Sequence, residues 1–178
     1  MSDAVFDTPL TGTSLVEASA GTGKTFALAG LYVRAVIEGG LRPQQILAVT
    51  FTEAATQELR ARVHLRLQQA QAMAAVWSPG DPPEREGDDG ETGLLRRMLH
   101  AAVAAGESPL ALRLRLARAA RDLEQAQIAT IHGFCRRLLA EHALEAGLVP
   151  DDARVETSQA RAHRELAVAL WREHAGDP

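Results

Sequence analysis

The segment Ala18-Ser19-Ala20-Gly21-Thr22-Gly23-Lys24-Thr25 constrains this chain more than any other feature. Lys24 is the only lysine, because the other 18 of the 19 basic residues are arginine. A compact ammonium reaches between the β- and γ-phosphates of a nucleotide, where the wider guanidinium fork does not fit. Gly21 and Gly23 let successive backbone N–H groups turn toward an anion, and the following helix N-terminus adds its positive dipole end. The segment predicts a phosphate-binding loop with Lys24 and Thr25 as candidate catalytic residues and the Thr25 hydroxyl on Mg²⁺.

The context of this loop favours a nucleotide site over an ordinary Gly-rich turn. Ser14–Ala18 is a short apolar strand candidate before it, and an apolar helical run over 26–37 follows and is closed by Gly39 and Gly40. Two more β-favouring runs, Ile46–Phe51 and Ile128–Ile131, are also followed by helical patterns. This alternation predicts a helix-rich α/β fold with a short parallel sheet and crossover helices.

Several helices are expected after the first one. Thr52 is a plausible N-cap with Glu53 in the first turn, followed by apolar residues at four-residue spacing. These residues are Ala55, Leu59, Val63 and Leu67. Pro109 opens a further helix, Gly133–Ala146 reads as another, and a last one is expected over about 158–174.

The acidic residues are concentrated in one segment. The formal net charge is −4, yet Gly80–Glu91 alone carries six acidic residues against one arginine. The longer segment that contains it, Ser78–Gly93, lacks apolar periodicity and is expected to be a mobile acidic loop. Arg96–Arg137 holds eight arginines against three acids. Solvated helix faces are the ordinary explanation, but such stretches also suit a polyanionic partner.

The remaining composition points to a protein of the cytoplasm. No run of 18 or more apolar residues is present, so no membrane span is expected. Cys135 is the single cysteine, which excludes an internal disulfide. We expect Cys135 to be a small buried hydrophobic residue.

Two further strand ends carry residues that could bind a ligand. Thr50 and Thr52 can donate hydrogen bonds to phosphate oxygens at the end of a buried strand, and Phe51 could stack on a nucleobase. Spacing alone favours Phe51 as a core residue. Thr130 and His132 repeat this layout at the end of the later strand, although a lone histidine is more often structural.

Three stretches, in this order, resemble motifs I, Ia and Ib of superfamily 1 helicases of the UvrD/Rep type. They are Glu17–Phe26, Val49–Thr56 continued by Glu58–Arg60, and Thr130–Cys135. The match is closer still to the family of exodeoxyribonuclease V beta subunits, which are helicase–nucleases. With the surrounding elements the resemblance covers about Leu15–Leu148, so most of the chain takes part.

The resemblance implies a partial RecA-like ATP-binding motor domain 1A over 1–147 and the start of a helical 1B subdomain over 148–178. It implies ATP and Mg²⁺ as cofactors, with Ala18 through Thr25 holding the nucleotide. It also implies contact with single-stranded DNA at a duplex end through Phe51, Thr52, Thr130 and His132, and thereby raises Phe51 to a base-contacting residue. Arg60, two turns into the helix after Thr52, is the candidate for neutralising a DNA phosphate, and Arg136 is the second.

The activity implied for the whole protein is that of an ATP-dependent DNA helicase and exonuclease acting in double-strand break repair and recombination. The gamma and alpha subunits of the exonuclease V complex would be its partners. The chain resembles the first fifth or less of such a subunit. The sequence shows no strand that ends in the Asp-Glu pair required for hydrolysis. The nearest candidate, Leu148–Asp152, contains Pro150, and proline is excluded from a central strand.

Two alternatives stay open from the residues alone. One is a free-standing, non-catalytic P-loop module that binds a nucleotide or single-stranded DNA. The other is an unrelated P-loop enzyme such as a small kinase, which would need acceptor-binding and catalytic residues that the sequence does not show.

Overall fold

The computed structural model describes residues 2–17, 23–83 and 85–146, and near the C-terminus residues 163–164, 166–168 and 171. The chain divides into two compact units, Met1–Phe134 and Cys135–Pro178. Ala18–Thr22, and with them most of the predicted phosphate loop, lie outside the described residues. Most of the helix expected over 158–174 and the first residues of the predicted subdomain 148–178 lie outside them as well.

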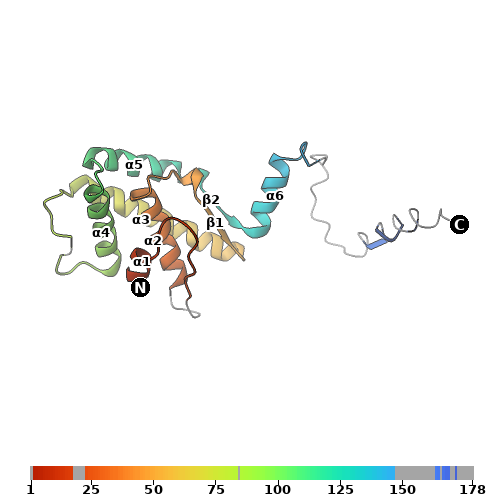
Figure 1. Cartoon of the computed structure of the whole chain (residues 1–178), viewed down its shortest axis with the longest axis horizontal. Coiled ribbons are helices and arrows are strands. Elements are labelled where there is room, and N and C mark those ends of the chain that lie inside the picture. The colour runs from red at the N-terminus through yellow and green to blue at the C-terminus, as the bar shows by residue number, and fades with distance from the viewer. Residues whose placement is uncertain are drawn as a thin grey trace. The chain divides into compact units, whose positions relative to one another are not determined.

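The described part is dominated by helices (Figure 1). In chain order its elements are α1 (Ser2–Asp7), α2 (Lys24–Ile37), η1 (Pro43–Gln45), β1 (Leu47–Thr50), α3 (Glu53–Val76), α4 (Gly90–Ala104), α5 (Pro109–Asp122), η2 (Leu123–Gln125), β2 (Gln127–Thr130) and α6 (Ile131–Glu141).

The sheet consists of two parallel strands among the described residues. Leu47 of β1 lies opposite Gln127 of β2, and Thr50 lies opposite Thr130. The second and third predicted strands are therefore confirmed. The first is wrong for the residues described, because 14–17 are not in a strand and the Leu15 side chain is 85% exposed. A short apolar run forms a strand only where a neighbour takes up its backbone hydrogen bonds.

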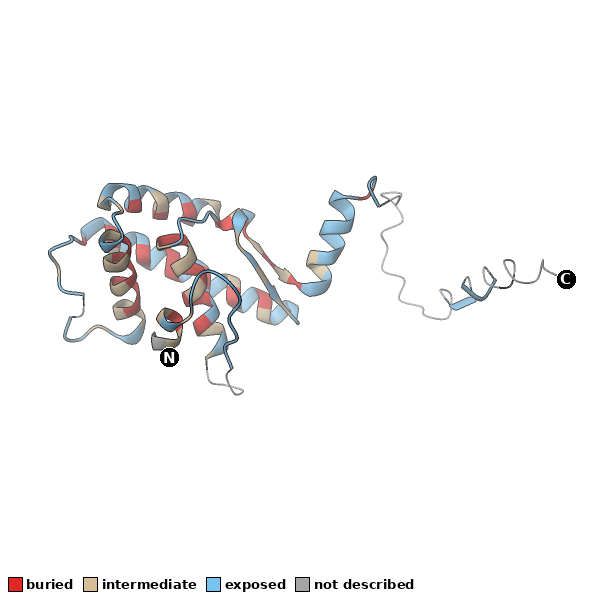
Figure 2. Ribbon diagram, in the orientation of Figure 1, coloured by how far each residue is buried: buried red, intermediate tan, exposed pale blue. Residues whose placement is uncertain are grey.

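Helix α3 organises the core of the first unit. It packs against α2, α4, α5 and both strands, and its buried face repeats every three or four residues (Figure 2). The apolar members of this face are Leu59, Val63, Leu67, Ala70 and Ala74. Thr52 caps α3 by accepting a hydrogen bond from the Ala55 N–H at 3.1 Å, as predicted. Ala55 itself is only half-buried.

Three predicted boundaries need correction. Gly90–Gly93 belongs to α4 and not to the acidic loop, because Asp89 accepts hydrogen bonds from the N–H groups of Glu91 and Thr92 and so starts the helix. The helix expected over 133–146 is α6, which begins at Ile131 and ends at Glu141. A capping hydroxyl or carboxylate can start a helix within a segment whose composition is typical of a loop.

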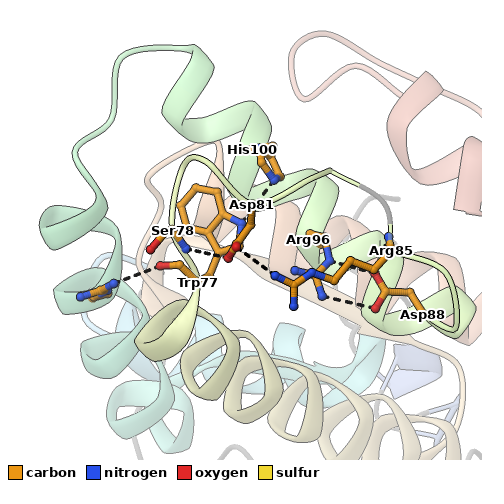
Figure 3. Close-up of polar contacts among 8 residues, drawn as sticks. Trp77, Ser78, Asp81, Arg85, Asp88, Arg96 and His100 are labelled. Carbon is orange, nitrogen blue, oxygen red and sulfur yellow. Dashed lines mark hydrogen bonds and ion pairs between the residues drawn. The ribbon is translucent and has the colours of Figure 1, made fainter.

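The acidic segment is fastened at both ends (Figure 3). At its start, the Trp77 indole donates to Nε2 of His100 at 3.3 Å, and their rings meet edge to face. At its end, Asp88 accepts from Nε of Arg96 at 2.8 Å, and only 8% of the Arg96 side chain is exposed. Between them, Asp81 accepts from the Arg85 guanidinium at 2.9 Å. The mobility of the residues between these anchors stays a prediction.

Acidification is expected to release the Asp88 anchor. The Arg96 guanidinium bonded to Asp88 lowers the pKa of that carboxyl below its usual range. A carboxyl with a lowered pKa in the folded protein stabilises it above the unfolded pKa, about 3.9 for aspartate, and this contribution is lost as the pH falls through the lower folded value. Unfolding by denaturant, followed between pH 6 and pH 2, should show Asp88→Asn losing stability less steeply with acid than the parent chain. Parallel profiles for the two proteins would contradict the assignment.

Candidate functional site

Helix α2 begins in a way that differs from the other long helices described. Gly23 occupies its N-cap position in the left-handed region at φ 83°, with no side-chain hydrogen bond to the first turn and no acidic residue in that turn. The helices α3, α4 and α5 are capped by the side chains of Thr52, Asp89 and Ser108. A glycine at this position cannot cap the first turn with its own side chain, and helix starts of this kind are suited to bind an anion with their N–H groups and positive dipole end.

The side chains at this helix start fit a nucleotide with its Mg²⁺. Lys24 is exposed and Thr25 is half-buried in the first turn of α2. Among the residues that the structure describes, no three His, Cys, Asp or Glu side chains gather into a metal site. In phosphate loops Mg²⁺ binds a first-turn hydroxyl together with phosphate oxygens, and Thr25 carries the hydroxyl that this role requires.

Phe51 lies at the carboxyl end of β1 with 88% of its surface exposed. The interpretation of Phe51 as a core residue is therefore wrong. Because β1 and β2 are parallel and paired, the residues that follow them lie at the same edge of the sheet. His132, two residues past β2, is also exposed. Two exposed rings thus follow neighbouring strands, at the edge where ligands bind in open parallel sheets.

The threonine hydroxyls at this edge are used within the protein. Thr130 is buried, donates to the Glu53 carboxylate at 3.1 Å and accepts from the Gly133 N–H at 3.0 Å. The hydroxyls of Thr50 and Thr56 lie 2.6 Å apart. These bonds join the end of β2 to the start of α3 and fix the strand ends. The contact of Glu53 with Thr130 was not predicted from the sequence. An acidic residue at a helix start does not indicate a partner 77 positions away in the chain.

The Arg60 side chain reaches back from α3 to the sheet. Its Nη2 donates to the carbonyl oxygen of Ile128 in β2 at 2.9 Å. This bond gives Arg60 a structural role, and its contact with a DNA phosphate stays a prediction, as do the contacts of Thr52, Thr130 and His132. Arg136 is exposed on α6 in the second unit.

The single cysteine is not buried. Cys135 is exposed, and no residue of α6 is buried. Our prediction for Cys135 was wrong because residue type and spacing do not show whether another element covers a helix face. In the described stretches, no helix has the length and apolar character needed to cross a membrane.

Part of the arginine excess lies inside the molecule. Arg66 and Arg96 are buried and paired with Glu91 and Asp88. Arg113 is exposed, although its guanidinium donates to backbone carbonyl oxygens of Ala74 and Trp77. The cationic surface available to a polyanion is therefore smaller than the sequence count suggests.

Comparison with known proteins matches residues 2–174 to the family described as the UvrD/REP helicase N-terminal domain. The chain is 34% identical to RecBCD enzyme subunit RecB of Escherichia coli (strain K12) over 93% of its length and 13% of that protein. It is 35% identical to RecBCD enzyme subunit RecB of Haemophilus influenzae over 93% of the chain and 14% of that protein. The corresponding protein of Mycolicibacterium smegmatis is 43% identical over 71% of the chain and 10% of its own length.

The chain thus spans a small part, 10–14%, of the length of these relatives. The match of nearly the whole chain agrees with the order of the three motifs, with the parallel pair of strands at whose ends two of them lie, and with the glycine at the N-cap of α2. This chain therefore belongs to the UvrD/REP helicase N-terminal domain family.

Proposed function

We propose that this chain is the N-terminal ATP-binding part of an ATP-dependent DNA helicase and exonuclease subunit that acts in double-strand break repair and recombination. The observation that carries the proposal is the start of α2, where Gly23 occupies the N-cap position in the left-handed region without a capping side chain and Lys24 and Thr25 follow it. The names of the relatives, as subunits of a RecBCD enzyme, agree with it. In this proposal 1–147 forms the partial RecA-like domain 1A and 148–178 begins the 1B subdomain, in a cytoplasmic protein.

In the proposed site, Ala18–Thr25 would hold the phosphates of ATP, which supplies the phosphoryl group for hydrolysis when bound with Mg²⁺. Backbone N–H groups at the start of α2 donate to phosphate oxygens. Lys24 places a positive charge against the β- and γ-phosphates, and the Thr25 hydroxyl binds Mg²⁺. Each of these groups stabilises charge on phosphate oxygens, while positioning of the attacking water requires residues that we have not found in this chain.

The proposed DNA site is the edge formed by the residues after β1 and β2. The exposed Phe51 ring offers a face on which a base can stack, and such stacking does not depend on sequence. His132 would contribute a second ring from the neighbouring strand. Thr52, Thr130 and Arg60 would position this edge or contact phosphates. Partner subunits equivalent to gamma and alpha of exonuclease V would complete the assembly.

The proposal is tested with a polypeptide that contains this chain and is as long as the relatives. ATP hydrolysis is measured with and without single-stranded DNA, and strand separation is followed from a blunt duplex end. We expect hydrolysis to rise with DNA and strands to separate only with ATP. If DNA does not change the rate of hydrolysis and the duplex stays intact, the protein is a nucleotide-binding module and the helicase proposal is refuted.

The 178-residue chain alone is expected to bind Mg-ATP weakly or not at all, and not to hydrolyse it. Its phosphate loop is present in the sequence, but the carboxylate that hydrolysis requires at a strand end was not found. Phosphate release by the purified chain should therefore equal the buffer background. Release above background that disappears in Lys24→Ala would show this expectation to be wrong.

A further inference from the structure

Arg66 is a buried cation in the middle of α3, with 1% of its surface exposed. Its Nη1 donates to the backbone carbonyl oxygen of Phe26 at 2.6 Å. Its guanidinium carbon lies 4.0 Å from the centre of the Phe26 ring, and Nε forms an ion pair with Glu91 at the start of α4. One side chain thus joins three helices.

The sequence makes room for this contact. Gly30 lies in the interior of α2, where glycine is unfavourable for a helix. A Cβ at this position would lie 3.2 Å from Nη1 of Arg66 and 2.9 Å from Cγ2 of Val5. A side chain at position 30 would crowd Val5 most closely and the Arg66 guanidinium next, so Gly30 leaves the space that both side chains occupy.

The bonded carbonyl belongs to the first turn of α2. Phe26 follows Lys24 by two residues, and Ala27 donates to the Gly23 carbonyl oxygen at 2.9 Å, so the turn is closed. A closed helical turn moves as a unit, and what fixes Phe26 also fixes the start of the helix. Arg66 therefore sets where Lys24 and Thr25 lie relative to α3, the helix that begins beside Phe51.

We propose that Arg66 is a positioning residue for the first turn of α2, acting with Phe26 and Glu91 to hold Lys24 and Thr25 where a nucleotide's phosphates bind. The identity of the ligand rests on the proposed function. The competing view is that Arg66 only stabilises the fold. Arg96 provides the matched control, since it is also buried and paired with an acid, but this acid, Asp88, lies outside α2.

The first test needs no nucleotide. Amide hydrogen exchange is measured over residues 27–30 in the full chain, for Arg66→Met and Arg96→Met at equal folded fraction. Losing a hydrogen bond from a charged group should speed exchange at these amides by about tenfold or more in Arg66→Met. Arg96→Met should leave them within about twofold of the parent. Equal changes in both variants would overturn the proposal.

Milder variants keep the test valid if Arg66→Met does not fold. Arg66→Lys retains the positive charge but loses the planar guanidinium, which contacts both Phe26 and Glu91. Glu91→Gln removes only the charge of the carboxylate. Both should speed exchange over residues 27–30 in the same direction. Exchange over these residues that matches the parent in both variants would overturn the proposal as well.

The second test measures the dissociation constant for Mg-ATP in a polypeptide of the relatives' length. Arg66→Lys should weaken binding by about tenfold, while Arg96→Lys should not change it per folded molecule. If Lys24→Ala weakens binding and Arg66→Lys does not, the positioning role is refuted. If Lys24→Ala also has no effect, the proposed nucleotide site is refuted, and the exchange measurement still decides whether Arg66 positions α2.

Discussion

Replacing Lys24 with alanine is expected to lower ATP hydrolysis about 10²–10³-fold in a polypeptide that carries this chain at the length of its relatives. Removing one preorganised positive or hydrogen-bonding group from developing charge typically has an effect of this size. Lys24 lies exposed at the start of α2. Because interactions of an exposed charge contribute about 1 kcal/mol or less, folding stability should change by no more than that amount. Steady-state phosphate release and thermal unfolding of the same preparation check both statements.

Two controls sharpen this experiment. Arg62→Ala removes a cation from the half-exposed pair that Arg62 forms with Glu58 on α3 and should leave hydrolysis unchanged. Lys24→Arg keeps the charge but introduces the planar fork, so it should not restore the rate. Full activity in Lys24→Arg would mean that charge alone suffices, and full activity in Lys24→Ala would place the nucleotide elsewhere.

Replacing Phe51 with alanine is expected to weaken single-stranded DNA binding by about 1–3 kcal/mol, or roughly 5- to 150-fold, because one stacking face is lost. With 88% of Phe51 exposed, the thermal stability should hardly change. Stacking carries no phosphate charge, so the salt dependence of binding should keep its slope. Binding titrations at several salt concentrations, with the full-length polypeptide, measure both quantities.

Other variants separate stacking from charge and from folding. Loss of an arginine that neutralises one phosphate should make the salt slope shallower by about 0.7, and Arg136 and Arg60 are the candidates. Leu67→Ala, at a fully buried position of α3, should instead cost about 2–5 kcal/mol of folding free energy without changing affinity per folded molecule. A Phe51→Ala protein that is strongly destabilised yet binds DNA normally would refute the stacking role.

Periodic patterns made much of the fold predictable. The four-residue spacing of Leu59, Val63 and Leu67 gave the buried face of α3, because the pattern of a helix and the core that it packs against coincide. Both paired strands were visible as short apolar runs before helical patterns. The run over 14–17 looked equally convincing, but a strand depends on a partner that no local pattern reveals.

Exposure was less predictable than secondary structure. Phe51 and Cys135 are both exposed although their residue types favour burial. Arg66 shows the converse, since a cation counted as surface charge lies in the core with Phe26 and Glu91 around it. Gly30 leaves space for this side chain and for Val5, but a glycine within a helix does not show which residues fill that space. Long-range pairs of this kind depend on the packing of three helices and cannot be obtained from spacing along one.

The most direct measurement is a hydrogen-exchange footprint of Mg-ATP on a polypeptide that carries this chain at the relatives' full length. We expect slower exchange of the backbone amides of residues 18–26, because in the proposed site these N–H groups would donate to phosphate oxygens. The protection should be absent in Lys24→Ala at the same nucleotide concentration. Protection that spares residues 18–26, or that persists unchanged in Lys24→Ala, would contradict a phosphate site at this helix.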